Sequence, residues 1–135
     1  MAESLKVSAV LPATVERIYK AWLSSKEHSA FTGAEARVTA RVGGAFTAWD
    51  GYIKGKTLEL EPNRRIVQSW RTTDFYADSP DSRLEVLLEP AARGTKITLV
   101  QTVLPYGQAY EYRQGWKDHY FTPMKAYFAA EAKKK

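Results

Sequence analysis

The central part of the chain, residues 35–103, alternates polar and apolar side chains with a period of two. Turn signals interrupt this alternation at hairpin spacing, namely Gly43-Gly44, Asp50-Gly51, Pro62-Asn63 and Arg93-Gly94. Asp50-Gly51 is the strongest of them, because a two-residue type I′ turn needs positive φ at both positions. The pattern predicts six strands in an antiparallel meander, at residues 37–42, 46–49, 52–61, 64–71, 84–88 and 97–103.

A further strand and one or two short helices are expected before the meander. Residues 5–9 alternate as a half-buried strand. Thr14 is placed to cap a helix that ends near Ser24, with one apolar stripe formed by Val15, Ile18, Tyr19 and Trp22. A second short helix is expected at residues 26–31, where Gly33 would end it.

The last segment predicts a long helix with an aromatic face, whose members are Trp116, Tyr120, Met124, Tyr127 and Phe128. Pro123 lacks an amide donor and crowds the carbonyl of His119, so we expect a bend there. The order of elements predicts an α+β fold in which a seven-stranded antiparallel sheet wraps around this helix. A chain of 135 residues fits one domain, residues 1–135, with a basic, frayed tail at about 130–135.

Several chemistries are excluded by composition and motifs. The chain has no cysteine, which excludes disulfides, cysteine-bound metals and thiol catalysis. His28 and His119 lie far apart in the sequence, and neither has the neighbouring ligand that a helical metal site would show. Phosphate-loop and dinucleotide motifs do not occur. We therefore expect no metal and no cofactor.

The formal net charge is +5, and the excess of Lys and Arg lies in the C-terminal third, where Lys133, Lys134 and Lys135 close the chain. A nucleic-acid footprint needs basic residues clustered on one face, so we expect no nucleic-acid partner. The sequence has no long uncharged run, and an acidic residue precedes any apolar stretch at its N-terminus. We expect no signal peptide, no membrane span and a cytoplasmic location.

Three separated motifs resemble one known family. They are GGAFTAWDGYIKG at 43–55, PNRRIVQSWR at 62–71 and GWKDHYFTP at 115–123. The sequence from Leu11-Pro12 to Phe128 resembles homologues of the activator of heat-shock protein 90 ATPase, a family of the START-like, birch-pollen-allergen-like superfamily. The resemblance implies a helix-grip fold. That superfamily includes lipid and polyketide binders, cyclases, hydroxylase subunits and co-chaperones, so the fold does not select a function.

A curved sheet that grips a helix through bulky aromatics leaves room for a cavity, and such cavities hold apolar ligands. We expect a non-enzymatic protein that binds a small, largely apolar molecule between the sheet and the C-terminal helix. The candidate ligand-binding residues are Phe46, Gln68, Trp70, Phe75, Gln101, Trp116, Tyr120 and Met124. Aromatic rings also dominate cores, so each of these rings has packing as its alternative role.

Gln68 and Gln101 have apolar neighbours at i±2, and a buried amide needs a hydrogen-bond partner. If both point inward, they orient the ligand; a bulge would instead turn them outward. Phe75 lies in an otherwise polar loop, which favours either a lid over the cavity or a cover for the end of the sheet.

Two alternative functions follow from the same sequence. In the eukaryotic co-chaperone that the family name implies, the matching region follows a separate N-terminal domain, and we expect no such domain here. The first alternative is nevertheless a protein-interaction module that engages a chaperone through the outer face of the sheet. The second is an enzyme in which His119 or Tyr120 transfers a proton. For His119 we favour an outward position, because no carboxylate or nucleophile accompanies it. The oligomeric state is undetermined.

Overall fold

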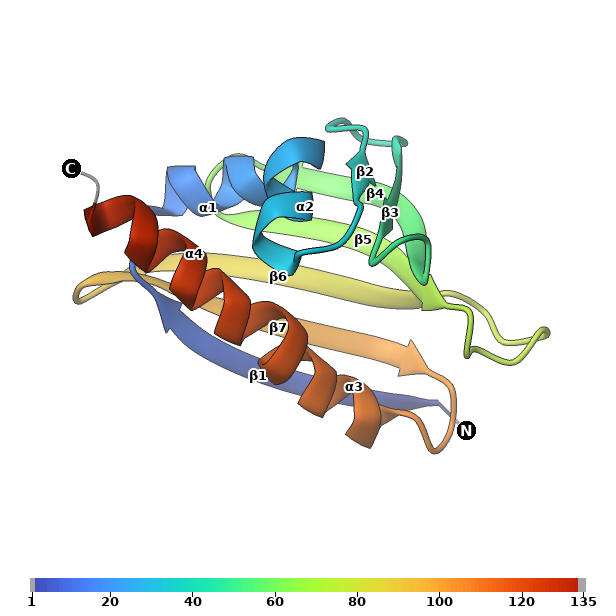
Figure 1. The fold of residues 1–135 in the computed structure, drawn as a ribbon. Coiled ribbons are helices and arrows are strands. Elements are labelled where there is room, and N and C mark those ends of the chain that lie inside the picture. Colours follow the sequence, from blue (N-terminus) through green and yellow to red (C-terminus); the bar gives the residue numbers. More distant parts are fainter. Residues whose placement is uncertain (1, 134–135) are drawn as a thin grey trace.

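The computed structural model describes residues 2–133. They form a seven-stranded sheet whose spatial order is β1-β7-β6-β5-β4-β3-β2, with every neighbouring pair antiparallel. The strands are β1 (Glu3–Leu11), β2 (Arg37–Val38), β3 (Ala45–Ala48), β4 (Ile53–Glu61), β5 (Arg65–Thr72), β6 (Ser82–Ala91) and β7 (Gly94–Leu104). The last six strands follow one another as a meander, and β1 closes the sheet beside β7 (Figure 1).

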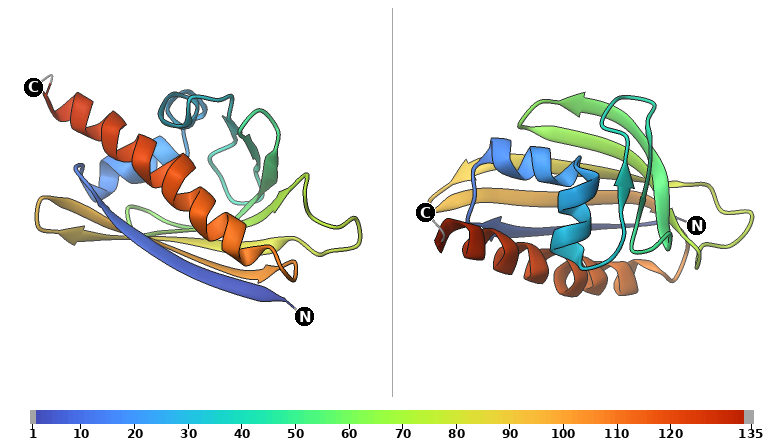
Figure 2. Two further views of the ribbon diagram at one scale, coloured as in Figure 1. Left: turned by 60° about the horizontal axis from the view of Figure 1, so that its bottom comes forward. Right: turned by 45° about the horizontal axis from the view of Figure 1, so that its top comes forward.

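All helices lie on one face of the sheet (Figure 2). The first two are α1 (Val15–Trp22) and α2 (Ser25–Thr32), between β1 and β2. The C-terminal helix consists of α3 (Ala109–Trp116), the π-helical segment η1 (Lys117–Phe121) and α4 (Thr122–Lys133), and it runs diagonally across the sheet (Figure 1). The expected α+β helix-grip architecture is therefore confirmed.

The short helices begin and end at local signals. Thr14 Oγ1 accepts a hydrogen bond from the amide of Arg17 at 3.2 Å, which caps α1 as expected. Ser24 caps α2 in the same way through the amide of Glu27. Gly33 ends α2 in the left-handed conformation with φ of 81°, a position that glycine occupies without steric cost. Both expected helices are confirmed at nearly their predicted bounds.

The predicted strand at residues 37–42 is wrong beyond Val38. The amide of Arg41 donates to the carbonyl of Thr39, and the amide of Gly44 donates to the carbonyl of Arg41, so the chain turns here instead of extending the strand. A Cβ at Gly44 would lie 2.5 Å from the carbonyl oxygen of Thr39. The close approach of these two backbones therefore shortens β2 to two residues.

The turn predicted at Asp50-Gly51 lies one residue earlier. The amide of Gly51 donates to the carbonyl of Ala48, and the central residues Trp49 and Asp50 have φ of 53° and 58°. Ala48 pairs with Ile53, so four residues connect β3 to β4. Asp50 exchanges hydrogen bonds with Glu35, through its amide and its Oδ1 atom. This contact with a distant segment holds Asp50 and moves the turn.

The bend expected at Pro123 takes the form of the π-helical segment just before it. The amide of Thr122 reaches back to the carbonyl of Lys117, and Thr122 Oγ1 donates to the same carbonyl at 2.9 Å. A wider turn makes room for the proline ring, which lacks an amide hydrogen. Trp116, Tyr120, Met124 and Phe128 of the aromatic face stay buried through this change, whereas Tyr127 is half-buried. α4 continues to Lys133, so residues 130–133 are helical, and residues 134–135 of the predicted tail lie outside the described residues.

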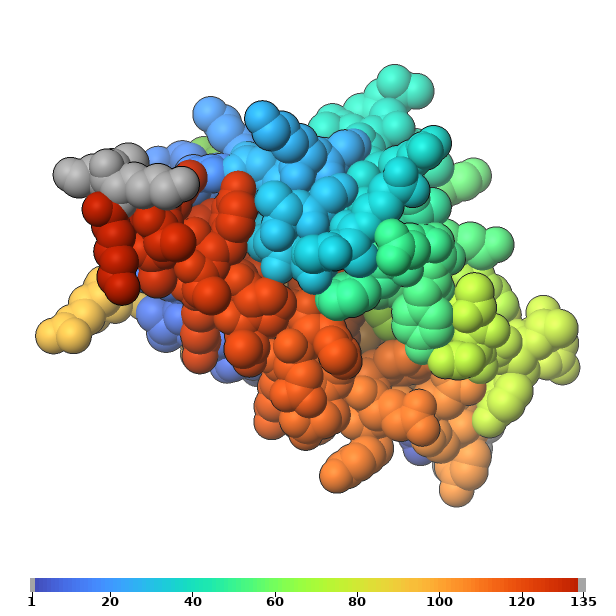
Figure 3. All heavy atoms as spheres, in the orientation of Figure 1, coloured from blue at the N-terminus to red at the C-terminus, as the bar shows by residue number. Residues whose placement is uncertain are grey.

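The core lies between the sheet and the helices, and its largest fully buried members include Phe128, Leu11, Ile18, Ile66 and Met124. Figure 3 shows the C-terminal helix packed beside α2 and the β3–β4 turn over this face. The layer that covers this face of the sheet is therefore assembled from the C-terminal helix, α2 and the β3–β4 turn, which are distant in the sequence.

Candidate functional site

A pocket of about 250 Å³ opens between the sheet and the middle of the C-terminal helix. Its walls are predominantly aromatic, and the lining residues are Trp49, Tyr52, Ile53, Trp70, Tyr112, Gly115, Trp116, His119 and Tyr120. The turn between β3 and β4 supplies one wall, strands β4 and β5 supply another, and the C-terminal helix supplies the third. Six phenol or indole rings thus converge on one space.

Three of the eight predicted ligand-binding residues line this pocket, namely Trp70, Trp116 and Tyr120. The other five are buried but do not line it, and they are Phe46, Gln68, Phe75, Gln101 and Met124. Phe75 packs behind the pocket wall, with its ring centroid 6.0 Å from that of Trp70. The structure therefore places part of the predicted set at the pocket and part in the packing around it.

Both glutamines point inward, and both bind tryptophan side chains. Gln101 Oε1 accepts a hydrogen bond from Trp116 Nε1 at 2.9 Å, and its Nε2 donates to Ser82 Oγ at 3.1 Å. Gln68 Oε1 accepts from Trp22 Nε1 at 3.3 Å. A buried amide gains its partners within the protein in this way. The two amides hold indole rings in place and do not face the pocket.

Six lining residues were not among those predicted from the sequence: Trp49, Tyr52, Ile53, Tyr112, Gly115 and His119. A signal existed for one of them, because Tyr112 lies four residues before Trp116 on the same helix and therefore shares its face. Trp49 and Tyr52 flank the Asp50-Gly51 turn, but a turn signal does not tell which side chains cross to another element. Their position is a tertiary feature.

The hydroxyls of the pocket tyrosines are engaged by the protein. Tyr52 donates to Asp74 Oδ2 at 2.6 Å, and Tyr112 donates to Gln108 Oε1 at 2.8 Å while it accepts from Thr72 Oγ1 at 2.7 Å. Burial raises the pKa of Tyr112 and that of Tyr52 above their ordinary value. Both phenols are therefore neutral donors at pH 7, with their hydrogens directed at other residues.

Tyr120 presents its ring to the pocket and its hydroxyl to His28. The Nδ1 atom of His28 lies 2.9 Å from the carbonyl of Trp22, so Nδ1 is the donor and Nε2 accepts from the Tyr120 hydroxyl at 2.8 Å. Burial lowers the pKa of His28 from 6.5 to about 4 and raises that of Tyr120. A neutral imidazole thus fixes a neutral phenol behind the wall. This arrangement positions a ring and offers no free proton donor to the pocket.

His119 is largely exposed, as we expected, yet its ring reaches the edge of the pocket. It contacts Trp49 edge to face, with the ring centroids 5.5 Å apart and the planes at 74°. The contact joins the β3–β4 turn to the C-terminal helix across the pocket. Trp49 is half-buried, and its Nε1 atom is the one buried side-chain polar atom without a hydrogen-bond partner among residues 2–133.

Residues 12–129 match the family model described as "Activator of Hsp90 ATPase homolog 1-like protein". The chain belongs to this family. The resemblance that the three sequence motifs carry is therefore confirmed over most of the chain.

Named relatives of this Hsp90 ATPase activator-like chain come from several eukaryotes. The chain is 26% identical over 118 residues to the human "Activator of 90 kDa heat shock protein ATPase homolog 1", covering 87% of this chain and 35% of that protein. It is 24% identical over 132 residues to the homologue from Dictyostelium discoideum, covering 97% of this chain and 34% of that protein. The chain thus spans about a third of the length of the curated relatives it matches.

Solved structures show the same fold. An HSP90 activator from Plasmodium falciparum superposes with a TM-score of 0.85 at 20% identity, covering 93% of this chain and 96% of that one. Protein CV1439 from Chromobacterium violaceum has a TM-score of 0.74 at 27% identity, with coverage of 93% and 96%. CalU16 from Micromonospora echinospora has a TM-score of 0.77 at 25% identity, with coverage of 98% and 80%. The activator-like fold thus occurs in chains with different names.

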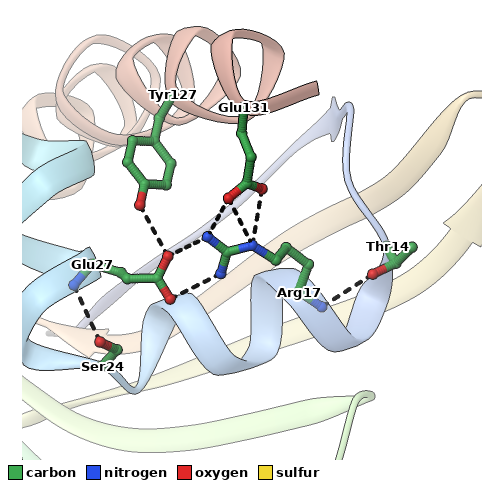
Figure 4. Close-up of polar contacts among 6 residues, drawn as sticks. All are labelled: Thr14, Arg17, Ser24, Glu27, Tyr127 and Glu131. Atoms are coloured by element: carbon green, nitrogen blue, oxygen red, sulfur yellow. Dashed lines mark hydrogen bonds and ion pairs between the residues drawn. The ribbon is translucent and has the colours of Figure 1, made fainter. Parts of the chain in front are cut away.

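One ion cluster of this family member joins three helices. Arg17 of α1 lies between Glu27 of α2 and Glu131 of α4 (Figure 4). Its Nη1 donates to Glu27 Oε2 at 2.9 Å and its Nε to Glu131 Oε2 at 2.9 Å, while Tyr127 donates to Glu27 Oε1. The hydrogen bond from Arg17 lowers the pKa of Glu27. The cluster holds α4 against α1 and α2.

The described residues hold neither a metal-binding cluster nor a membrane-spanning helix. Residues 2–133 contain no group of three or more His, Cys, Asp or Glu side chains that could hold a metal ion. Within that range, no helix has both the length and the apolar composition needed to cross a membrane.

Proposed function

We propose that the chain is a non-enzymatic binding protein for a small, largely apolar molecule that occupies the aromatic pocket. The observation that carries this proposal is the convergence of six indole and phenol rings on about 250 Å³, with the tyrosine hydroxyls bonded elsewhere. Burying apolar ligand surface contributes about 25 cal/mol per Å². Affinity would therefore come from ring contacts, and polar atoms would set the orientation.

The proposed binding residues divide into two groups. Trp70, Trp116 and Tyr120 would contact the ligand directly, because they line the pocket. Phe46, Phe75, Met124 and the two glutamines, Gln68 and Gln101, would act through packing and hydrogen bonds that fix those rings. A non-enzymatic role is favoured because the Tyr120 hydroxyl donates to His28, away from the pocket.

Native mass spectrometry of the purified protein beside the denatured chain tests the proposal, followed by calorimetry with a panel of fatty acids and aromatic probes. The blocking variant is Gly115→Leu, because Gly115 lines the pocket and a Cβ there meets nothing closer than His119 Cδ2 at 3.9 Å. Gln114→Leu, on the exposed side of the same turn, is the matched control.

We expect an adduct or a bound probe in the wild-type protein and in Gln114→Leu, with binding lost in Gly115→Leu. Bound ligand should also raise the melting temperature, since it binds the folded state alone. Absence of any adduct, together with no binding across the panel, would overturn the proposal.

A second candidate function, a chaperone-interaction module, is favoured by the names of the relatives, which are called activators of the 90 kDa heat-shock protein ATPase. In this role the outer face of the sheet would engage the chaperone. The test adds the purified chain to a purified 90 kDa heat-shock protein and measures ATP hydrolysis. Stimulation that persists in Gly115→Leu would favour this function, whereas no stimulation at saturating chain would count against it.

We also propose that residues 1–135 form one domain, as expected from the sequence, and that it resides in the cytoplasm. A single cooperative thermal transition, with the same midpoint by fluorescence and by circular dichroism, is the expected behaviour of one domain. Two separate transitions would contradict it. Fractionation of the source cells tests the location.

A further inference from the structure

The indole N–H of Trp49 has no hydrogen-bond partner in the described part of the chain, although it is buried. Buried N–H groups are paired in the great majority of folded proteins, so an unpaired one calls for an explanation. The indole of Trp116, on the C-terminal helix, differs from that of Trp49, because Trp116 Nε1 donates a hydrogen bond to Gln101. Trp49 is itself a lining residue, so this unpaired donor belongs to a side chain of the pocket wall.

The backbone that carries Trp49 is strained. Trp49 has φ of 53° and Asp50 has φ of 58°, which are left-handed values that bulky L-residues rarely adopt. Residues held in sparsely populated conformations cluster at ligand clamps and switch regions. Trp49 also keeps one ring contact that spans the pocket, to the exposed His119. The backbone of the β3–β4 turn is held by the hydrogen bonds between Asp50 and Glu35, whereas the indole Nε1 atom of Trp49 has no hydrogen bond that a rotation of the ring would break.

The chemistry of the remaining lining atoms narrows what this donor can meet. The tyrosine hydroxyls donate to Asp74, Gln108 and His28, so they do not compete for a ligand acceptor. Lysine and arginine are absent from the lining residues, so no permanently charged cation of the described pocket would compensate an anionic ligand. An indole N–H donates and does not accept.

We propose that the ligand of this pocket is a neutral, apolar molecule with one carbonyl-type acceptor, and that Trp49 rotates to donate its Nε1–H to that acceptor. This inference rests on the proposed binding function and names the class of molecule that the pocket selects. Trp49 is then the specificity-determining residue, while the surrounding rings supply contact that does not depend on the acceptor. A hydrocarbon of the same shape binds, but more weakly.

Two probes of nearly equal shape separate these contributions. 2-Acetylnaphthalene carries a carbonyl oxygen, and 2-isopropenylnaphthalene replaces that oxygen with a methylene group. We expect wild-type protein to prefer the acetyl probe about fivefold by calorimetry, the typical effect of one added hydrogen bond. Trp49→Phe keeps an aromatic wall without the donor, so the preference should disappear while the isopropenyl probe binds nearly as before.

Trp70→Phe is the comparison variant, because it changes a ring that contacts both probes. It should weaken the binding of both probes to a similar extent and leave the ratio of their affinities unchanged. A second measurement needs no variant protein in the binding step. In ¹⁵N-labelled wild-type protein, the Trp49 indole resonance, assigned by its loss in Trp49→Phe, should move downfield with the acetyl probe and not with the isopropenyl probe.

The outcomes distinguish this inference from the proposed function. Equal affinity of both probes for the wild type would overturn the role of Trp49 and leave apolar binding standing. If Trp49→Phe still prefers the acetyl probe over the isopropenyl probe, the role of Trp49 as the donor would be overturned as well. If neither probe binds, and none of the fatty acids and aromatic probes of the panel binds either, the proposed binding function itself would be overturned.

Discussion

The indole N–H of Trp116 donates to the side-chain oxygen of Gln101 at 2.9 Å, which ties the C-terminal helix to the centre of the sheet. The Nε2 atom of Gln101 donates a hydrogen bond to Ser82 Oγ, and the Ser82 hydroxyl in turn donates to the carbonyl of Trp70 at 2.6 Å. The two tryptophans lie with their ring centroids 5.4 Å apart and both line the pocket. One fully buried amide therefore sets the spacing between two walls.

Replacing Gln101 by Leu should lower the free energy of unfolding by about 2–3 kcal/mol, because it leaves Trp116 Nε1 buried and unpaired. Urea denaturation measures this change. In the double variant with Trp116→Phe the indole donor is absent, so a coupling of about 1 kcal/mol or more is expected between the two sites. Strict additivity of the two changes would contradict a direct role for this hydrogen bond.

The neutral, buried His28 should make stability depend on pH. Burial lowers the pKa of His28 in the folded state from 6.5 to about 4. Below pH 6.5 the His28 ring is therefore protonated in the unfolded chain, whereas it stays neutral in the folded chain until the pH approaches 4. The free energy of unfolding should therefore fall as pH falls from 6.5 to 4, by about 3 kcal/mol over that window. Denaturant titrations between pH 7 and 4.5 measure the slope before most carboxylates protonate.

His28→Gln is the test variant for this pH dependence, since it removes the titrating ring. The variant should be less stable at pH 7, because the hydrogen bonds to Tyr120 and Trp22 are disturbed, and its stability should change little from pH 7 to 4.5. His119→Gln removes the other histidine and should retain the slope. An unchanged slope in His28→Gln would show that another group is responsible.

Two glycines should respond oppositely to alanine. Gly115 lies in α3, and a Cβ there meets nothing closer than 3.9 Å, so Gly115→Ala should stabilise the fold by about 0.5–1 kcal/mol through helix propensity. At Gly55 of β4 a Cβ would lie 1.8 Å from the carbonyl oxygen of Ser69, so Gly55→Ala should destabilise it strongly. Thermal unfolding of the pair checks both signs. A loss of stability in Gly115→Ala would mean that the helix there is already strained.

Arg17 should contribute to stability through its two carboxylate partners. Arg17→Met removes the cation between Glu27 and Glu131, and we expect a loss of about 1–2 kcal/mol, because the cluster is half-buried and charge-assisted. Arg17→Lys should recover less than half, since an ammonium cannot span both carboxylates with a planar fork. The loss should shrink in 1 M NaCl, where charges are screened within about 3 Å. Equal losses at low and high salt would instead indicate packing against Phe128.

Local patterns determined most of the elements. Period-two alternation and turn residues predicted the strands of the meander, and Arg93-Gly94 turns the chain between β6 and β7 as expected. Thr14 and Gly33 set the start of α1 and the end of α2 through interactions with residues within four positions. The same aromatic stripe that predicted the C-terminal helix also placed Trp116 and Tyr120 at the pocket. These features follow from short-range backbone and side-chain chemistry.

Long-range contacts decided the rest. The bond between His28 and Tyr120 joins residues 92 positions apart, and that between Trp22 and Gln68 joins residues 46 positions apart. Neither pairing leaves a periodic trace in the sequence, because any buried donor accepts whichever acceptor the packed fold presents. The position of Trp49 at the pocket depends in the same way on the contact between Asp50 and Glu35. The sequence by itself thus determined the sheet, the helices and their apolar faces, whereas the tertiary structure alone decided which buried polar atoms of the described residues are paired and which one is left unpaired.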